Sequence, residues 1–120
     1  MRERAESLSY EIIQNSPNGI VLLDSDFYIQ DINIKGRELL GINDPRAKGR
    51  HAKDFFNLVD FMIAYNEKRN VKVEKMFVPS TGKYVDILIT YLKEQNMLFG
   101  IFIDVSNQVN YDNEINKLRK

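Results

Sequence analysis

Three acidic residues lie close together in the segment DSDFYIQD, residues 24–31, and their spacing is partly that of a calcium-binding loop. Asp24 and Asp26 occupy the first and third positions of such a loop. The sixth position needs a glycine for a sharp turn, and it is Ile29. The twelfth needs a bidentate glutamate, and it is Lys35. These acids therefore predict a turn and not a calcium site.

Residues that build other catalytic or metal sites are scarce in this chain. It contains one histidine, His51, and no cysteine. A multi-histidine or cysteine-based metal site and a thiolate nucleophile are therefore excluded. The segment GRELLG, residues 36–41, lacks the Lys-Ser/Thr pair of a phosphate-binding loop, and no pair of carboxylates stands out as an acid–base pair. We expect a protein without catalytic activity, in which His51 is a surface residue or starts a helix.

An apolar ligand pocket is the other kind of site that the residue types allow. Asn33 and Tyr65 carry the polar groups that could orient a ligand beside an apolar wall. The same pattern also fits an ordinary hydrophobic core, with Asn33 as a helix cap. The candidate pocket residues are Asn33, Phe56, Met62, Tyr65, Phe77, Ile87, Ile101 and Ile103.

The spacing of apolar residues predicts the elements that position these side chains. Three- and four-residue spacing indicates helices, and alternation or short apolar runs between turn residues indicate strands. Asn33 is placed to start one helix and Gly41 to end it. The expected order is a helix over 2–15, strands over 20–24 and 28–32, a short helix up to Gly41, a helix over 57–68, strands over 71–78, 84–92 and 97–105, and a helical tail.

The strands are joined by short turns, so the pattern predicts an antiparallel sheet. The fold class is therefore α+β, a five-stranded antiparallel sheet with helices packed on one face. The last two strands are apolar on both faces, whereas such a sheet normally leaves one face to water. The middle helices can cover one face. The N-terminal helix or a second copy of the chain would cover the other, through Leu8, Ile12, Leu88, Leu98 and Phe102.

The length and the net charge of the chain limit the classes of function that the protein could have. The chain has 120 residues, a formal net charge of +0 and a sequence pI of about 6.6, which favours one domain. The balanced charge argues against nucleic-acid binding. The sequence has no polybasic segment and no apolar run of the roughly 20 residues that span a bilayer. We therefore expect a cytoplasmic domain that binds neither nucleic acid nor membrane.

The expected organisation has three parts. Residues 1–18 form an amphipathic N-terminal cap, residues 19–106 the core, and residues 107–120 a C-terminal linker helix. In the linker an apolar residue recurs at spacings of four and three, which predicts a short coiled-coil seam that continues in a longer protein. The seam residues are Tyr111, Ile115 and Leu118.

The segment IIQNSPNGIVLLDSDFYIQDINIKGRELLGI, residues 12–42, resembles the start of a PAS domain, a sensor module of many signalling proteins. Asp24, Asn33 and Gly41 fall where that family has them, and DVS, residues 104–106, resembles its closing Asp-Ile-Thr. The glycine common in the first hairpin turn is missing, so Asp26 is expected to adopt the positive φ there.

The resemblance implies a module that binds a small ligand, a cofactor or nothing between the sheet and the middle helices. It also implies a homodimer and a C-terminal helix that relays a signal to an effector domain of a regulatory or two-component protein. Asp104 and Ser106 lie at the strand-to-helix joint, where Ser106 is expected to cap the tail helix and Asp104 to favour its positive end. The alternative is a ligand-free module for dimerisation or protein interaction.

The cofactor stays unknown on this resemblance. Haem-binding relatives carry an axial histidine on the long middle helix, and residues 57–68 contain none. The flavin photosensors of the family use a cysteine, which this chain lacks. Haem and cysteinyl-flavin are therefore not expected, whereas a noncovalently held flavin is left open.

Overall fold

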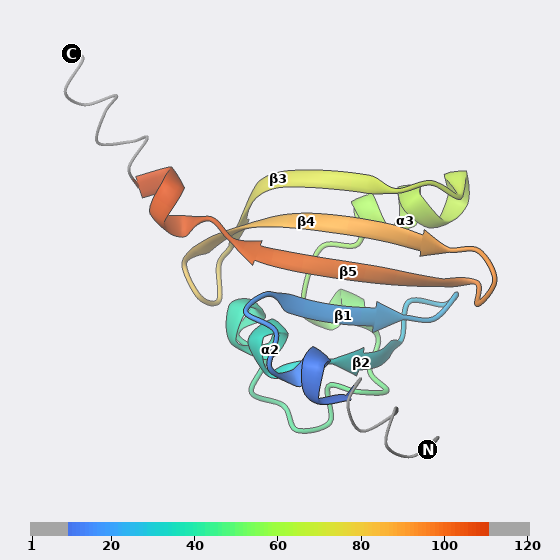
Figure 1. The fold of residues 1–120 in the computed structure, drawn as a ribbon, viewed down its shortest axis with the longest axis horizontal. Coiled ribbons are helices and arrows are strands. Elements are labelled where there is room, and N and C mark those ends of the chain that lie inside the picture. Colours follow the sequence, from blue (N-terminus) through green and yellow to red (C-terminus); the bar gives the residue numbers. More distant parts are fainter. Residues whose placement is uncertain (1–9, 111–120) are drawn as a thin grey trace, which may run out of the picture.

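The computed structural model describes residues 10–110. Short helical segments at residues 10–14 and 106–110 flank the strands and helices between them (Figure 1). These are β1 (Gly19–Leu23), β2 (Ile29–Ile32), α2 (Ile34–Leu40), η1 (Ala52–Asp54), α3 (Val59–Glu67), β3 (Val71–Val78), β4 (Lys83–Leu92) and β5 (Met97–Asp104).

The five strands form one antiparallel sheet in the order β2-β1-β5-β4-β3. Figure 1 shows α3 and η1 behind this sheet, whereas the turn of helix at residues 10–14 lies in front of it. The predicted α+β class with a five-stranded antiparallel sheet is therefore confirmed. Among residues 10–110, no helix combines the length and apolar character needed to cross a membrane.

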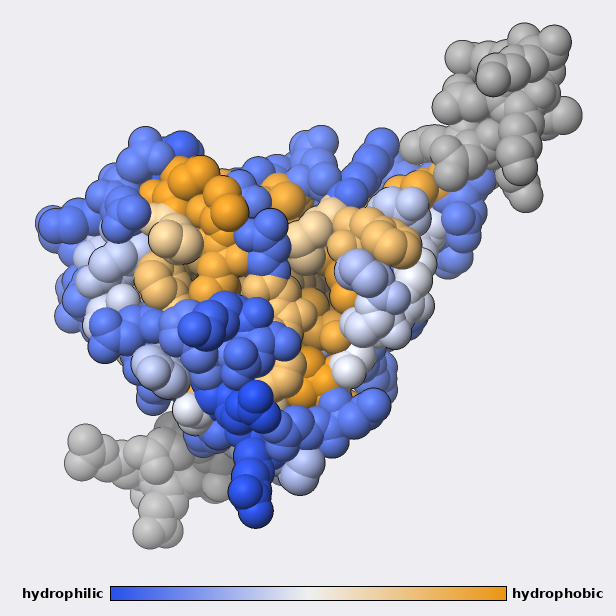
Figure 2. Space-filling view, turned by 180° about the vertical axis from the view of Figure 1, so that it is seen from behind, coloured by the Kyte–Doolittle hydropathy of each residue, from blue (hydrophilic) through white to orange (hydrophobic). Residues whose placement is uncertain are grey.

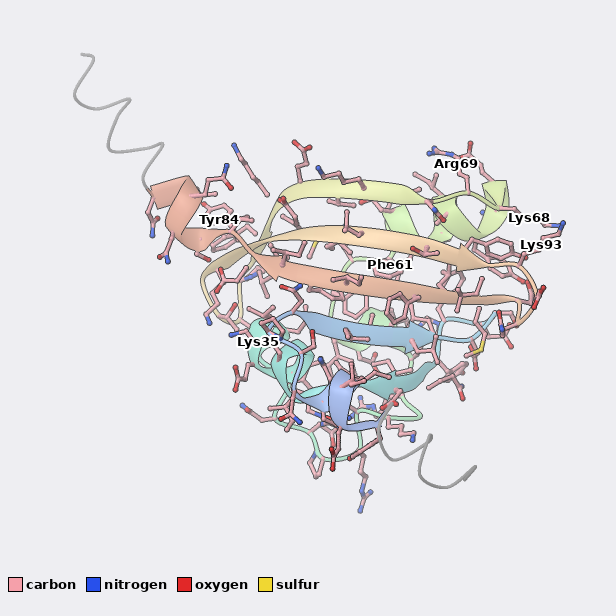
Figure 3. All side chains as sticks on the ribbon, in the orientation of Figure 1. Lys35, Phe61, Lys68, Arg69, Tyr84 and Lys93 are labelled. Carbon is pink, nitrogen blue, oxygen red and sulfur yellow. The ribbon has the colours of Figure 1, made fainter. Side chains whose placement is uncertain are left out.

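The interior between the sheet and the helices is filled by aromatic rings. The ring of Phe56 lies 5.3 Å from that of Phe61 and 5.6 Å from that of Phe102, measured between centroids. Phe61 and Phe102 are fully buried, and Figure 3 shows Phe61 behind the central strands. Gly100 makes this approach possible, because a Cβ atom there would lie 3.0 Å from the Phe61 ring.

The prediction of which β5 side chains face the core is wrong. Ile101 and Ile103 were expected in the pocket wall, and Leu98 and Phe102 on the outer face. The structure reverses this arrangement, because Phe102 pairs with the inward-facing Ile87 across the sheet. Leu98 and Phe102 are fully buried on the helix side, while Ile101 and Ile103 are half-buried on the opposite face.

The first hairpin turn also differs from the expectation. Phe27, and not Asp26, adopts the positive φ, at 67°. Asp24 holds the turn, because its Oδ1 accepts hydrogen bonds from the backbone N–H of Asp26 (2.9 Å) and of Tyr28 (3.0 Å). The predicted turn role is therefore confirmed for Asp24, whereas Asp31 lies in β2, where its Oδ1 accepts a hydrogen bond from the N–H of Ile32 at 2.9 Å.

Asn33 is the one buried polar side chain of the described residues. Its Oδ1 accepts hydrogen bonds from the N–H groups of Ile20 (2.7 Å) and Gly36 (2.8 Å). Its Nδ2 donates to the carbonyls of Ile13 (2.8 Å) and Asn18 (3.0 Å). One amide thus caps α2 and joins it to β1 and to the segment that precedes β1.

We predict that Asn33→Ala lowers the free energy of unfolding by about 3 kcal/mol, because several partly or fully buried backbone groups lose their partner. Urea unfolding followed by circular dichroism would measure this loss. Asn15→Ala is the matched control, since it removes one exposed hydrogen bond to Glu11 and should cost no more than about 0.5 kcal/mol. Equal losses in both variants would contradict the role assigned to Asn33.

Candidate functional site

An open groove on the helix side of the sheet is the main candidate site. It has a volume of about 440 Å³ and lies between β3 and the segment that connects η1 to α3. Figure 2 shows this side of the molecule, where hydrophobic residues gather around a hollow. The lining residues are Phe55, Phe56, Asn57, Asp60, Val73, Met76, Phe77, Val78 and Pro79.

A bulge in β3 aims the apolar side chains of this strand at the groove. The pairing with β4 shifts between Val73 and Met76, and Lys75 adopts a φ of 53°. The N–H of Lys75 is satisfied by Oδ1 of Asp86 at 2.9 Å. The extra residue changes the alternation, so that Val73 and Met76 share the inner face with their partners Ile87 and Val85 on β4.

Only two of the predicted pocket residues, Phe56 and Phe77, line the groove. Ile87 belongs to the core, and Met62 is 45% exposed outside the groove. The alternation of apolar and polar residues over 71–78 does not indicate a bulge. The predicted pocket residues therefore did not include Val73, Met76 and Val78. The sequence signal that could have found them is the charged pair Glu74-Lys75 within an otherwise alternating strand.

Asn33 cannot orient a ligand, because all its hydrogen-bonding groups are used within the fold. Its alternative role as a helix cap is confirmed. Tyr65 is also engaged elsewhere, since its hydroxyl accepts a hydrogen bond from Nδ2 of Asn96 at 3.2 Å. Oδ1 of Asn96 accepts another from the hydroxyl of Tyr91 at 3.0 Å. These residues hold the β4–β5 turn, and Tyr65 is absent from the groove lining.

His51 is the N-cap residue of η1, which agrees with one of its two predicted roles, that of a residue at the start of a helix. Its Nδ1 accepts a hydrogen bond from the N–H of Lys53 at 3.2 Å, and its ring packs edge-on against Tyr28. Within residues 10–110, no three His, Asp or Glu side chains are grouped so that they could hold a metal ion.

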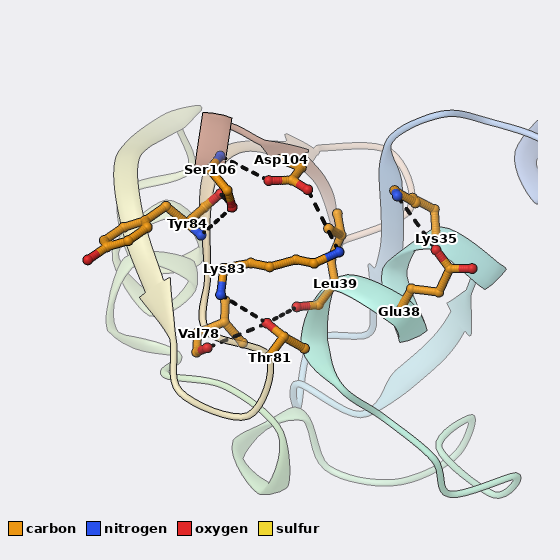
Figure 4. Close-up of polar contacts among 9 residues, drawn as sticks. All are labelled: Lys35, Glu38, Leu39, Val78, Thr81, Lys83, Tyr84, Asp104 and Ser106. Carbon is orange, nitrogen blue, oxygen red and sulfur yellow. Dashed lines mark hydrogen bonds and ion pairs between the residues drawn. The ribbon is translucent and has the colours of Figure 1, made fainter. Parts of the chain in front are cut away.

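The joint between β5 and the C-terminal helical segment is the second candidate site (Figure 4). Ser106 does not cap this segment as predicted, because the helix begins at Ser106 and Val105 takes the cap position. The Oγ of Ser106 instead accepts a hydrogen bond from the N–H of Tyr84 at 3.0 Å. The N–H of Val105 donates to the carbonyl of Tyr84 at 2.9 Å. Two residues thus tie the base of the helix to the start of β4.

Asp104 interacts with the positive end of this helical segment, as expected. Its Oδ1 accepts a hydrogen bond from the N–H of Ser106 at 3.0 Å, and its Oδ2 lies 3.8 Å from Nζ of Lys83. Hydrogen bonding by the side chain of Ser106 lowers the pKa of Asp104 most, and the backbone hydrogen bond and Lys83 lower it further. Together they outweigh the opposing effect of burial.

The loop between β3 and β4 connects the two candidate sites to α2. The hydroxyl of Ser80 donates to the carbonyl of Leu40 at 2.8 Å, and that of Thr81 to the carbonyl of Leu39 at 3.1 Å. These bonds satisfy carbonyls at the end of α2 that have no partner within the helix. The loop that follows the groove is therefore fixed to the helix layer.

The outer face of the sheet carries an apolar patch. Ile101 lies at its centre, paired with Ile20 on one side and Leu88 on the other. Of the residues predicted for this face, Leu88 lies there, Ile12 is 71% exposed on the preceding helical turn, and Leu8 lies outside the described residues. The patch residues are Ile20, Leu22, Leu88, Phe99, Ile101 and Ile103.

No protein-family model matches the sequence, and no curated protein matches it at a significant level. Solved structures do match. The PAS domain of an HTR-like protein from Haloarcula marismortui has a TM-score of 0.66 at 22% identity, with 85% of this chain and 98% of that chain covered. The PAS domain of nitrogen regulation protein NR(II) from Vibrio parahaemolyticus has a TM-score of 0.63 at 13% identity, with 81% and 97% covered.

The histidine kinase ThkA, in its complex with the response regulator protein TrrA, has a TM-score of 0.73 at 21% identity. The match covers 87% of this chain and 33% of the kinase chain. These similarities agree with the strand order β2-β1-β5-β4-β3 and with the layer of helices on one face of the sheet. The chain therefore has the PAS fold.

Proposed function

We propose that the chain is a non-catalytic sensory module that binds a small ligand in the groove beside β3. Ligand binding is passed to the C-terminal helix and from there to an effector domain of a larger signalling protein. The observation that carries this proposal is a short physical path from the groove to that helix. Phe77 lines the groove, and its ring lies 5.2 Å from that of Tyr84.

The backbone of Tyr84 then bonds to the first residues of the helical segment. Its carbonyl accepts from Val105, and its N–H donates to Ser106; Figure 3 shows Tyr84 beside this segment. A ligand that moves β3 or its loop would thus alter the hydrogen bonds that set the direction of the helix. The size of the response is limited by the difference in the ligand's affinity for the two helix positions.

Two of the structural matches are complexes with a second protein, which supports a role in protein assemblies. ThkA was solved in complex with a response regulator protein, and the E. coli DhaR(N)–DhaL complex matches 85% of this chain with a TM-score of 0.66. The matched region covers 33% of the ThkA chain and 36% of the chain in the DhaR(N)–DhaL complex. This chain is proposed to serve a comparable regulatory role.

Amide NMR spectra during a titration with phenethyl alcohol would test the groove and the relay together. We expect shifts at the groove residues 55–60 and 73–79 and, with the same apparent Kd, at Val105 and Ser106. Ser106→Ala should keep the groove shifts and weaken those at residues 105–110. Ser16→Ala makes the same change far from the path and should alter neither set.

This titration tests ligand binding in the groove and the relay to the C-terminal helix separately. Groove shifts without any change at residues 105–110 would contradict the relay. If no groove shifts occur with an apolar probe of this size, the groove is not a ligand site.

The lowered pKa of Asp104 predicts a pH-dependent contribution to stability. A carboxyl group whose pKa is lower in the folded state stabilises the fold at pH values above its unfolded-state pKa, which is close to 3.8. This stabilisation is lost as the pH falls through the folded-state pKa. Asp104→Asn should therefore unfold at a lower urea concentration than the wild type at neutral pH. The difference should shrink as the pH is lowered below about 4. A difference that stays constant from neutral to acid pH would contradict the electrostatic role.

Dimerisation is the second candidate function, with or without a ligand. The aromatic rings that fill the interior favour a ligand-free module, and the outer apolar patch offers a surface for a second copy. Leu88, at the edge of this patch, is 37% exposed. Apolar residues gathered on one face mark interaction surfaces more often than scattered ones do.

We predict that Ile101→Glu shifts the chain to the monomer, because it places a charge in the centre of the apolar patch. Sedimentation velocity of the wild type and the variant would measure the effect. Ile34→Glu introduces the same charge at an exposed position at the start of α2 and should leave the oligomeric state unchanged. A monomeric wild type, or an Ile101→Glu variant that still forms dimers, would count against this interface.

A further inference from the structure

Asp60 is the one charged residue that lines the groove. It lies in the first turn of α3. Within the described part of the chain, no hydrogen bond or ion pair involves its carboxylate. The other polar lining residue, Asn57, is engaged, because its Oδ1 accepts from the N–H of Val59 at 2.9 Å. The groove thus presents a single unneutralised negative charge.

The rest of the lining contains no cation that could neutralise this charge. It consists of aromatic, aliphatic and methionine side chains and one proline. The guanidinium of Arg50 contacts one lining residue, since it lies 5.5 Å from the ring centroid of Phe55. Arg50 is itself paired with the carboxylates of Asp44 and Asp54. Its charge is therefore already balanced outside the groove.

We propose that the groove selects a small organic cation, an ammonium group on an aromatic or aliphatic body. The ammonium group would pair with Asp60, and the body would lie against Val73, Met76 and the other apolar side chains. A charge pair is stronger beside apolar walls than in bulk water, because the effective dielectric constant is lower. The phenyl rings of the lining add a favourable surface for a cation. An anionic ligand of the same shape would be repelled.

Asp60 also occupies a position where acids stabilise a helix through its dipole. That role alone would change the stability of α3 but not the preference of the groove between ligands of different charge. A readout of charge preference therefore separates the two roles. The inference rests on the proposed function of the groove as a ligand site.

Three probes of nearly equal shape test the inference: phenethylammonium, phenethyl alcohol and phenylacetate. Each is titrated into the wild type at neutral pH and low salt, and amide NMR shifts give the affinities. We expect phenethylammonium to bind about fivefold more tightly than phenethyl alcohol and phenylacetate to bind most weakly. Added salt should reduce the preference for the cation, because it screens exposed charges.

Variants of Asp60 assign the preference to its carboxylate. Asp60→Asn should bring the affinities of the cation and the alcohol together without weakening binding of the alcohol. Asp60→Glu keeps the charge and should keep the preference. Asp60→Ser, a residue favoured near helix starts, repeats the neutral test if the Asn variant folds poorly. Asp26→Asn, the same change in an exposed turn away from the groove, should behave like the wild type.

The outcomes distinguish this inference from the proposed function on which it rests. Equal binding of the cation and the alcohol at the groove would overturn the cation preference and leave the groove as a ligand site. A preference that survives in Asp60→Asn would also overturn the assignment. Absence of groove shifts with all three probes would overturn both the inference and the ligand-binding function.

Discussion

The arrangement of this fold depends on the hydrogen bonds that the side-chain amide of Asn33 makes. This amide is buried, and it joins β1, the start of α2 and the segment over residues 13–18 through four hydrogen bonds. A buried amide is stable only when its partners are in place, so these three segments must take their native positions together. The close contact of Gly19 with Gly36, where an added Cβ would lie 2.9 Å from the neighbouring Cα, follows from the same junction.

The position of α3 follows from the contact of Phe61 with Gly100, and it decides where space for a ligand remains. The missing side chain at Gly100 lets the ring of Phe61 approach the middle of β5, where it packs with Phe56 and Phe102. The centre of the domain is thereby filled. The candidate groove lies at the edge, where the bulge of β3 turns Met76 inward beside the start of α3.

This position gives the groove a short connection to the end of the domain. The loop that follows β3 is anchored to α2 by Ser80 and Thr81, and Tyr84 just after it bonds to Val105 and Ser106. Few hydrogen bonds therefore separate the groove from the C-terminal helical segment. The unpaired charge of Asp60 lies at the opposite wall of the same groove, so one small volume combines a candidate recognition group with the start of the path.

The sequence by itself determined the α+β class, the strand order along the chain and the cap at Asn33, because hairpin turns, alternation and capping residues are local signals. It did not determine which side of β5 faces the core. The run MLFGIFI is apolar on both faces, so its alternation has no preferred direction, and only the pairing of Phe102 with Ile87 decides it. The groove was likewise decided by tertiary structure, because the β3 bulge depends on Asp86, a residue of the neighbouring strand.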